Sequence, residues 1–377
     1  MQQKIYLDEG TTSWPKSEAT LRALVEAAQL WGSPSRGNSL LPDRKLAHAR
    51  SVVADYLGIA DSENIVFVPG ATFGLNFVLK GFLKPGDKVL VSIAEHNSVL
   101  RPLAELEAQG VELVWMECDF AGRVQADWVE KYFAAGNSAQ AIVCQQASNV
   151  TGIMQPVEEL CSLGNRYNVA VIVDGSQAGG HLPINLEQMR PSAWICSGHK
   201  GFRGIKGVGV VYLREDFRPQ PLITGGTGNG DENVPELICP ESYEVGTEPL
   251  PAIVALGAAL EYEEKTLGEI RAAELERIGM FMQGVEEVPD LSILGKANAE
   301  QRLPIISVMS KKFTPDELAF TLSKKYGIET RSGMHCAPLL HKHFGTYERG
   351  GAVRFSFSHL TTLEDLHITL RALKEIC

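Results

Sequence analysis

The apolar residues of this chain fall into short continuous runs that are separated by longer amphipathic segments. Each run has about four to six residues, many of them β-branched, which is typical of strands buried on both faces of a sheet. We predict such strands at 65–68, 88–92, 111–116, 141–144, 169–173, 193–196 and 208–213.

The segments between these runs carry apolar residues at helical spacing. Leu21 and Val25, for example, lie on one face of the segment 17–31, and Ser17 is placed to cap its first turn. Buried strands that alternate with amphipathic helices indicate an α/β fold, in which helices cover both faces of a mainly parallel sheet. Further helices are expected at 44–57, 70–79, 98–109 and 157–167.

The pattern changes from about residue 256. A long charged helix is followed by shorter strand and helix units, and the last helix is expected at 363–375. We therefore predict a large domain over 17–255. A smaller α+β domain would combine residues 1–16 with 256–377.

The composition narrows the class of protein. The chain has 377 residues, 44% of them hydrophobic, and a formal net charge of -11, which argues against nucleic acid or an anionic membrane as a partner. It has no apolar run of about eighteen residues that would span a membrane. Its seven cysteines form no C-x-x-C pair, so we expect reduced thiols in a cytoplasmic protein.

One lysine, Lys200, lies between two predicted strands, in a glycine-rich segment that cannot be regular structure. Desolvation lowers the pKa of an ammonium group, and a neutral lysine amine attacks aldehydes. The alternative is a lysine at the end of a strand whose charged head reaches solvent. The two interpretations can be distinguished by whether other residues of the chain are placed to bind an aldehyde cofactor.

Polar residues stand at the ends of other predicted strands. Thr72, at a turn from strand to helix, can cradle a phosphate, or it can simply cap the helix. Asp174 can pair with a protonated pyridine nitrogen, Gln177 with a phenolic oxygen, and His96 can stack on an aromatic ring. Taken singly, Asp174 is also a common turn residue and His96 a common structural one. Because Asn149 ends a further strand, all of these groups are expected at one edge of the sheet.

These motifs resemble those of the class V aminotransferase-fold enzymes, which depend on pyridoxal 5'-phosphate, and within them the cysteine desulfurase and selenocysteine lyase family. The resemblance covers nearly the whole chain. It implies fold type I, with a seven-stranded, mainly parallel sheet in the large domain and the catalytic cysteine loop in the small one. The matching motifs are Tyr-Leu-Asp at 6–8, Gly-Ala-Thr at 70–72, Glu-His at 95–96, Ser-Asn-Val-Thr-Gly at 148–152, Asp-Gly-Ser-Gln-Ala at 174–178, Ser-Gly-His-Lys at 197–200, Gly-Thr at 246–247 and Arg-Ser-Gly-Met-His-Cys at 331–336.

The resemblance implies a role for each site residue. Lys200 is the lysine that bonds to the cofactor, Asp174 the partner of its ring nitrogen and Gln177 the donor to its phenolic oxygen. His96 stacks on the ring and is the candidate proton donor, while Asn149 and Arg354 hold the substrate carboxylate. The phosphate ligands are Ala71, Thr72, Ser197, His199 and, from the neighbouring subunit of a homodimer, Thr247.

By the same resemblance, Cys336 is the nucleophile that takes sulfur from L-cysteine, leaving L-alanine and a persulfide for an acceptor protein. Arg331 and His335 are expected to favour its thiolate, and Gly333 to give its loop freedom. A metal site built from His335, Cys336, His341 and His343 has no supporting ligand spacing.

Other functions remain open at this point. The same motifs fit a selenocysteine lyase, or a class V aminotransferase, epimerase or C–S lyase that acts on another amino acid. A catalytically silent sulfur-relay or partner-binding protein would have no chemical need for Lys200 and Asp174. Three segments depart from the family pattern near the substrate entrance, namely Glu9-Gly10, Glu248-Pro249 and the glycine-rich stretch at 225–230 with the short segment after it.

Overall fold

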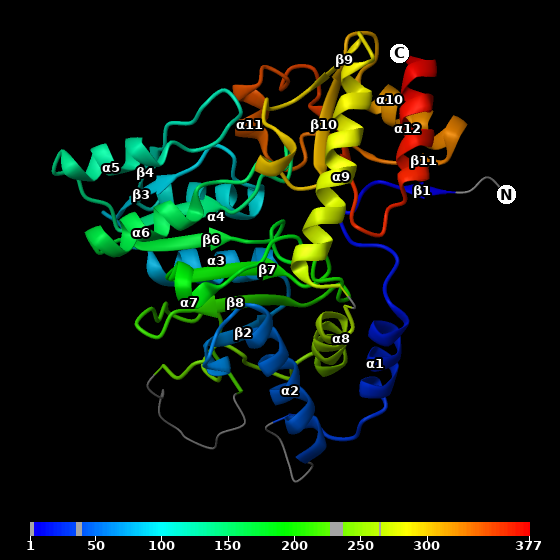
Figure 1. Ribbon diagram of the computed structural model, residues 1–377. Helices are drawn as coiled ribbons and strands as arrows, with labels where there is room; N and C mark the ends of the chain where they lie inside the picture. Colours follow the sequence, from blue (N-terminus) through cyan, green and yellow to red (C-terminus); the bar gives the residue numbers. More distant parts are fainter. Residues whose placement is uncertain (1–3, 35–39, 227–236, 264) are drawn as a thin grey trace.

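The computed structural model describes residues 4–34, 40–226, 237–263 and 265–377. Most of the glycine-rich stretch at 225–230, and the first part of the segment that follows it, lie outside the described residues. Two bodies of structure are visible, a large sheet with its helices and a smaller sheet beside the long helix α9 (Leu267–Glu286) (Figure 1).

The larger sheet has seven strands in the order β2-β8-β7-β6-β5-β3-β4. Five neighbouring strands, from β7 to β4, run parallel, and β8 is antiparallel to both of its neighbours. The predicted seven-stranded, mainly parallel sheet is therefore confirmed. Its strands are β2 (Ile65–Val68), β3 (Lys88–Val91), β4 (Glu112–Trp115), β5 (Ala141–Gln145), β6 (Ala170–Asp174), β7 (Ala193–Ser197) and β8 (Gly209–Leu213).

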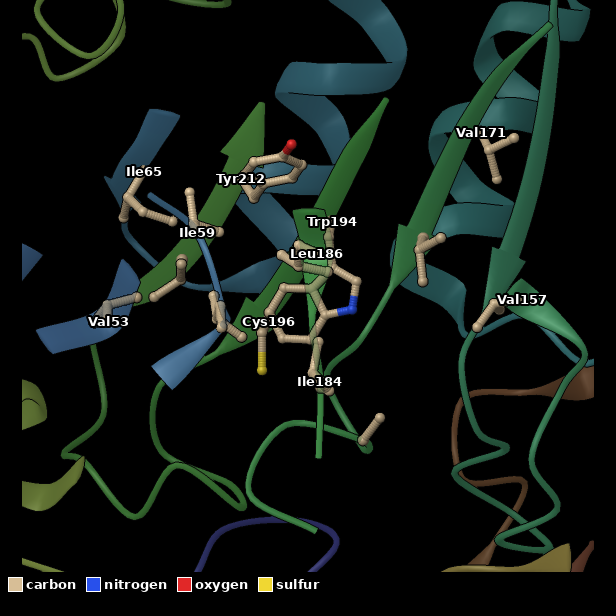
Figure 2. Packing of buried hydrophobic residues seen from close by; sticks show 14 of the residues in the cluster. Val53, Ile59, Ile65, Val157, Val171, Ile184, Leu186, Trp194, Cys196 and Tyr212 are labelled. Atoms are coloured by element: carbon tan, nitrogen blue, oxygen red, sulfur yellow. The ribbon is translucent and has the colours of Figure 1, made fainter. Parts of the chain in front are cut away.

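Helices cover both faces of this sheet and enclose two separate hydrophobic cores. In one core, α3 and α4 pack on the first face of the sheet. In the other, α2, α5, α6 and α8 pack on the second face. Trp194 and Cys196 of β7 enter the second core side by side with Ile184 and Leu186 (Figure 2). The helices are α1 (Glu18–Ala28), α2 (Leu40–Tyr56), α3 (Ala71–Phe82), α4 (Asn97–Glu107), α5 (Ala126–Ala134), α6 (Val157–Tyr167), α7 (Leu186–Met189) and α8 (Leu250–Glu261).

Helix α1 departs from the sequence-based expectation. It is capped by Ser17 as predicted, because the Ser17 hydroxyl accepts the Thr20 N–H at 3.1 Å. Two residues of the apolar face are left largely uncovered by the described part of the chain, however, since Leu21 is 47% and Val25 is 56% exposed. Small residues such as Ala27 are buried instead. The helix therefore presents an apolar surface that this chain alone does not cover.

The smaller sheet is antiparallel, in the order β12-β13-β10-β9, and it lies beside α9 and α12. The N-terminal strand β1 (Ile5–Tyr6) pairs in parallel with β11 (Ile328–Glu329), so Ile5 and Leu7 join the core of this second body. The domain boundaries themselves remain a prediction. The remaining elements are β9 (Leu291–Ile293), β10 (Ile305–Ser310), β12 (Arg331–Gly333), β13 (Ala352–Ser356), α10 (Pro315–Thr321), α11 (Pro338–His343), α12 (Leu363–Ile376) and the short helical turns Ser62–Asn64, Ala299–Gln301 and Leu322–Tyr326.

Among the described residues, no helix has the length and apolar character needed to cross a bilayer.

Candidate active site

The carboxyl ends of β5, β6 and β7 and the N-termini of α3 and α4 open onto one cavity. Parallel strands bring polar groups together in this way, because all of their carboxyl ends lie at the same edge of the sheet. Four residues of the lining, Ser98, Gln145, Ala147 and Ser176, were not predicted from the sequence. The predicted site residues that line the cavity are Ala71, Thr72, His96, Asn149, Asp174, Gln177, Ser197 and Lys200.

Lys200 and Asp174 set the charge of this cavity. Burial lowers the pKa of the Lys200 ammonium, and the Asp174 carboxylate opposes this shift. Asp174 is only 5% exposed, and its Oδ1 accepts the N–H of Ser176 at 2.9 Å. A carboxylate buried to this degree needs a cationic partner or further donors to offset its desolvation. The cavity therefore suits a ligand that carries a cationic nitrogen toward Asp174.

His96 caps helix α4 with its own ring. Its Nδ1 accepts the backbone N–H of Ser98 at 3.0 Å and lies 2.8 Å from the Ser98 hydroxyl. Burial, followed by the charge of Lys200, lowers the pKa of His96 to about 4. The imidazole is therefore neutral at physiological pH, and because Nδ1 is an acceptor, its single proton resides on Nε2.

A buried glutamate directly precedes His96 in the chain. Glu95 is fully buried, and its Oε1 accepts the Gln145 N–H at 2.8 Å and the Ser92 hydroxyl at 2.5 Å. Burial raises the pKa of Glu95 to about 8, so the carboxyl group is mostly protonated at neutral pH. Glu95 thus links the residue that follows β3 to the last residue of β5.

The first turn of α3 forms an open cradle. Gly70 is its N-cap, with φ of 109°, and no side chain caps the turn, so its amides remain available to an anion. Strand β8 passes close behind this turn at Gly209, where a Cβ atom would lie 2.7 Å from the Gly70 backbone. Ala71, Thr72 and, from the end of β7, Ser197 border the same part of the cavity.

Two predicted phosphate ligands lie outside this lining. His199 directs its Nδ1 to the hydroxyl of Thr12 at 3.1 Å, and its carbonyl oxygen accepts the N–H of Ser13 at 3.0 Å. Burial lowers the pKa of His199 to about 4. Thr247 is exposed and does not border the cavity of its own chain. It remains available for the site of a second subunit.

Arg354, which is predicted to bind the substrate carboxylate, is held in place by residues from distant parts of the chain. Arg354 is 2% exposed, and its Nη2 lies 2.8 Å from Asp8 Oδ1 and 3.0 Å from Thr11 Oγ1. Its Nη1 donates to the carbonyl of Asn149 at 3.0 Å, whereas its Nε has no partner among the described residues. The guanidinium is thus fixed in place with one donor group unused. Arg331, its partner on the neighbouring strand, donates to the same Thr11 hydroxyl at 2.8 Å.

The N-terminal segment takes part in the site through further contacts. The side-chain amide of Gln177 donates to the carbonyl of Gly10 at 3.1 Å, and the Tyr6 hydroxyl donates to that of Thr12 at 2.8 Å. Sequence reasoning assigned no role to Asp8 or Thr11. The Tyr-Leu-Asp motif at 6–8 was the available signal, because an acid that follows a short apolar strand needs a partner when it is buried.

Cys336 lies on a loop with an uncommon backbone. Both His335 (φ 48°) and Cys336 (φ 58°) adopt left-handed conformations, which L-residues populate sparsely. The Cys336 carbonyl accepts the Asn97 N–H at 2.7 Å, and the His335 carbonyl accepts the Asn149 amide at 2.5 Å. Cys336 itself is half-buried and unpaired with any other cysteine.

The expectation that His335 would help to stabilise the thiolate is wrong. The ring is buried, so its pKa falls well below the ordinary value, and its Nε2 lies 3.2 Å from the carbonyl of Arg331. A neutral imidazole that donates to the backbone offers no positive charge to Cys336. Within the described ranges, no group of three or more His, Cys, Asp or Glu side chains lies close enough together to hold a metal ion.

Comparison with known proteins identifies the family. The model of the aminotransferase class-V family matches residues 5–368, and the chain therefore belongs to this family. The resemblance stated from the motifs, and the fold class that it implied, are confirmed.

Several relatives of this family carry the name cysteine desulfurase. One from Cereibacter sphaeroides is 31% identical over 396 residues, covering 99% of this chain and 96% of the relative. A probable cysteine desulfurase of Pyrococcus abyssi is 29% identical and covers 100% and 94%. The match to a cysteine desulfurase of Synechococcus elongatus, at 30% identity, covers 87% of this chain and only 53% of the relative, so the chain spans about half of that longer protein.

A solved structure agrees with this result. The apo structure of a cysteine desulfurase from Thermococcus onnurineus NA1 superimposes with a TM-score of 0.91 at 29% sequence identity, covering 99% of this chain and 94% of that one.

Proposed function

We propose that this chain is a pyridoxal-phosphate-dependent cysteine desulfurase, which converts L-cysteine to L-alanine and retains the sulfur as a persulfide on Cys336. The observation that carries the proposal is the joint position of Lys200 and Asp174 in one buried cavity. A lysine of lowered pKa and a buried carboxylate are the two groups that a pyridine aldehyde requires. The names of the relatives support the choice of substrate.

The residues of the cavity fit the cofactor. Lys200 would bond to its aldehyde carbon, and Asp174 would hold the proton on its ring nitrogen. The uncapped first turn of α3, together with Thr72 and Ser197, would bind its phosphate. When bound, pyridoxal 5'-phosphate withdraws electrons from the substrate Cα and so makes its proton acidic.

The chain's own groups then move protons and orient the substrate. Arg354 binds the α-carboxylate of L-cysteine through its unused Nε donor, while Asp8 and Thr11 keep the guanidinium in place. Lys200 Nζ takes the proton from Cα, since its lowered pKa leaves the amine free to act as a base. His96 is the proposed proton donor when the C–S bond breaks; because its imidazole is neutral, it first takes up the proton that Cys336 releases on becoming a thiolate, and it then passes this proton on.

Cys336 completes the reaction as the nucleophile. Its thiolate attacks the sulfur of the substrate, so that an S–S bond forms as the C–S bond breaks. The carbon skeleton takes up protons and leaves as L-alanine. The terminal sulfur of the persulfide is then passed to an acceptor protein or is released by a reductant.

We further propose a cytoplasmic homodimer with shared active sites. Exposed apolar residues on α1, at Trp31, at the start of α2 and at 222, 223 and 238 give support, because the described part of a single chain leaves them uncovered. Thr247, also exposed, would reach the phosphate of the partner's cofactor. The reduced state of the seven cysteines fits the proposed compartment. The exposed apolar residues are Leu21, Val25, Trp31, Leu40, Leu41, Leu222, Ile223 and Ile238.

The test is the release of L-alanine and sulfide from L-cysteine in the presence of a thiol reductant. We expect equal amounts of both products from the wild type, and neither from Cys336→Ala with full cofactor absorbance. Absence of alanine from the cofactor-loaded wild type would overturn the proposal. L-selenocysteine and larger amino acids would then be assayed, as substrates of a selenocysteine lyase, aminotransferase, epimerase or C–S lyase.

A further inference from the structure

The loop that carries Cys336 is held by two hydrogen bonds to consecutive carbonyl groups. The backbone N–H of Asn97, in the first turn of α4, donates to the Cys336 oxygen at 2.7 Å. The side-chain Nδ2 of Asn149 donates to the His335 oxygen at 2.5 Å. Both acceptor residues have positive φ, at 58° and 48°. Two bonds at adjacent residues therefore hold a backbone turn that would otherwise relax.

The donor of the second bond sits on a rigid support. The Ser148 hydroxyl accepts the N–H groups of Val150 and Thr151, each at 3.1 Å. Ser307 Oγ donates to the carbonyl of Val150 at 2.6 Å, and Arg354 Nη1 donates to that of Asn149 at 3.0 Å. The turn that carries Asn149 is thus fixed on three sides before its side chain reaches the loop.

Close packing strengthens the same support. A Cβ atom on Gly152 would lie 2.6 Å from the carbonyl oxygen of Ile305, so this turn rests directly on the entry to β10. Asn149 is 4% exposed, and its Oδ1 has no hydrogen-bond partner among the residues that the structure places. The amide orientation follows from the contact with His335, because a carbonyl oxygen can accept only from the nitrogen of the amide.

We propose that Asn149 is a positioning residue for the nucleophile, and that its amide fixes the loop of Cys336 through the His335 carbonyl in addition to any contact with substrate. This inference rests on the proposed function, because it assigns to the carboxylate-binding residue a second task. The same amide borders the cofactor cavity and holds the turn of the sulfur-accepting thiol. Substrate binding and the placement of Cys336 therefore meet at one side chain.

The two possible roles of Asn149 predict different behaviour of the enzyme without substrate. In one role it only binds the substrate carboxylate, and in the other it also holds the loop of Cys336. If Asn149 binds only the substrate, its removal raises KM and leaves the loop unchanged when no amino acid is present. If it holds the loop, its removal also lowers kcat, since the thiol is less often in the attacking position. In addition, Cys336 becomes more accessible to reagents before any substrate is added.

The experiment measures alkylation of Cys336 by iodoacetamide in cofactor-loaded protein without amino acid, followed by peptide mass spectrometry. Cys118, which is also half-buried but lies on another loop, serves as the reference in the same molecule. We expect the ratio of the two rates to rise about three- to tenfold in Asn149→Ala, the range for loss of one ordinary hydrogen bond. Asn149→Asp should give at least as large a rise, because a carboxylate oxygen faces the His335 oxygen.

Ser307→Ala is the matched control, because it removes a hydrogen bond to the same turn without touching the loop of Cys336. Its alkylation ratio should equal that of the wild type. An unchanged ratio in both Asn149→Ala and Asn149→Asp, with cofactor absorbance intact, overturns the inference. If Asn149→Ala fails to fold, Asn149→Asp, which preserves the volume, decides alone. The proposed function is tested separately by the alanine assay. If the wild type forms no alanine while the alkylation ratios of the variants still change as described, the function is wrong and the role of Asn149 in the loop stands.

Discussion

Arg354 and Asp8 form a partly buried ion pair, with 2.8 Å between Nη2 and Oδ1, although 346 positions separate them in the chain. The N-terminal segment therefore belongs to the active site as much as the C-terminal strand β13 does. Because Asp8 and Thr11 occupy one edge of the guanidinium, its Nε, which has no partner among the described residues, is the donor that we propose for the substrate carboxylate.

This arrangement predicts the effect of removing the guanidinium. Arg354→Met should raise KM for L-cysteine about 30- to 5000-fold, because loss of a buried, hydrogen-bonded charge costs about 2–5 kcal/mol. Steady-state kinetics of cofactor-loaded protein measure this. In the control Asp8→Asn, Arg354 keeps its bonds to Asn149 and Thr11, so KM should change less than about fivefold. Equal KM values in wild type and Arg354→Met would place the carboxylate elsewhere.

Asp174 should govern kcat rather than cofactor retention. With the neutral amide in Asp174→Asn, the ring nitrogen loses its anionic partner, and kcat should fall about 10²- to 10³-fold, as for other buried electrostatic groups. The control is Ser176→Ala, since the Ser176 hydroxyl has no partner among the described residues and its N–H to Asp174 is retained. A kcat close to that of the wild type in Asp174→Asn would remove this carboxylate from the mechanism.

Glu95 predicts a dependence of stability on pH. Its folded-state pKa, raised to about 8 by burial, exceeds the ordinary value of 4.5, so the folded protein keeps a proton that the unfolded chain releases. The free energy of unfolding should therefore fall as pH rises from about 5 to 8, by up to about 1.4 kcal/mol per pH unit. Urea unfolding of wild type and Glu95→Gln across this range isolates the contribution. Parallel curves for the two proteins would contradict the assignment.

The phosphate cradle should be sensitive to one methyl group. Gly209→Ala places a Cβ atom 2.7 Å from the Gly70 backbone, which must move away from the first turn of α3. We expect cofactor affinity, measured by titration of the apoprotein with pyridoxal 5'-phosphate, to fall about tenfold or more. Gly279→Ala on α9 is the control, because a Cβ there meets no atom within 4 Å. Equal affinities in Gly209→Ala and the wild type would show that the first turn of α3 does not bind the phosphate.

The sequence predicted the large sheet well, because a strand buried on both faces is a continuous apolar run. The helix Val157–Tyr167 and the strand Ile65–Val68 have the predicted bounds, and the other strands of the large sheet differ by only one or two residues. The positions of Thr72, Asp174 and Lys200 followed from the topology, since each ends a strand or follows one at the same sheet edge.

What could not be predicted depends on contacts between distant segments. Nothing local in the sequence indicates that Asp8 meets Arg354, or that the Asn97 N–H reaches Cys336. The burial of His335 could not be predicted either, and it removes the positive charge expected beside the thiol. The exposure of Leu21 and Val25 on α1 could not be predicted either, because periodicity alone cannot distinguish a face that packs on the core from one left for an interface.

The most direct test of the account is the mass of the peptide that carries Cys336 after brief exposure of the enzyme to L-cysteine without reductant. We predict a gain of one sulfur atom on Cys336, removable by a thiol, with a matching amount of L-alanine in solution. Lys200→Ala should show neither product. Alanine formation by the wild type with no added sulfur on Cys336 would contradict the central claim that this thiol receives the substrate sulfur.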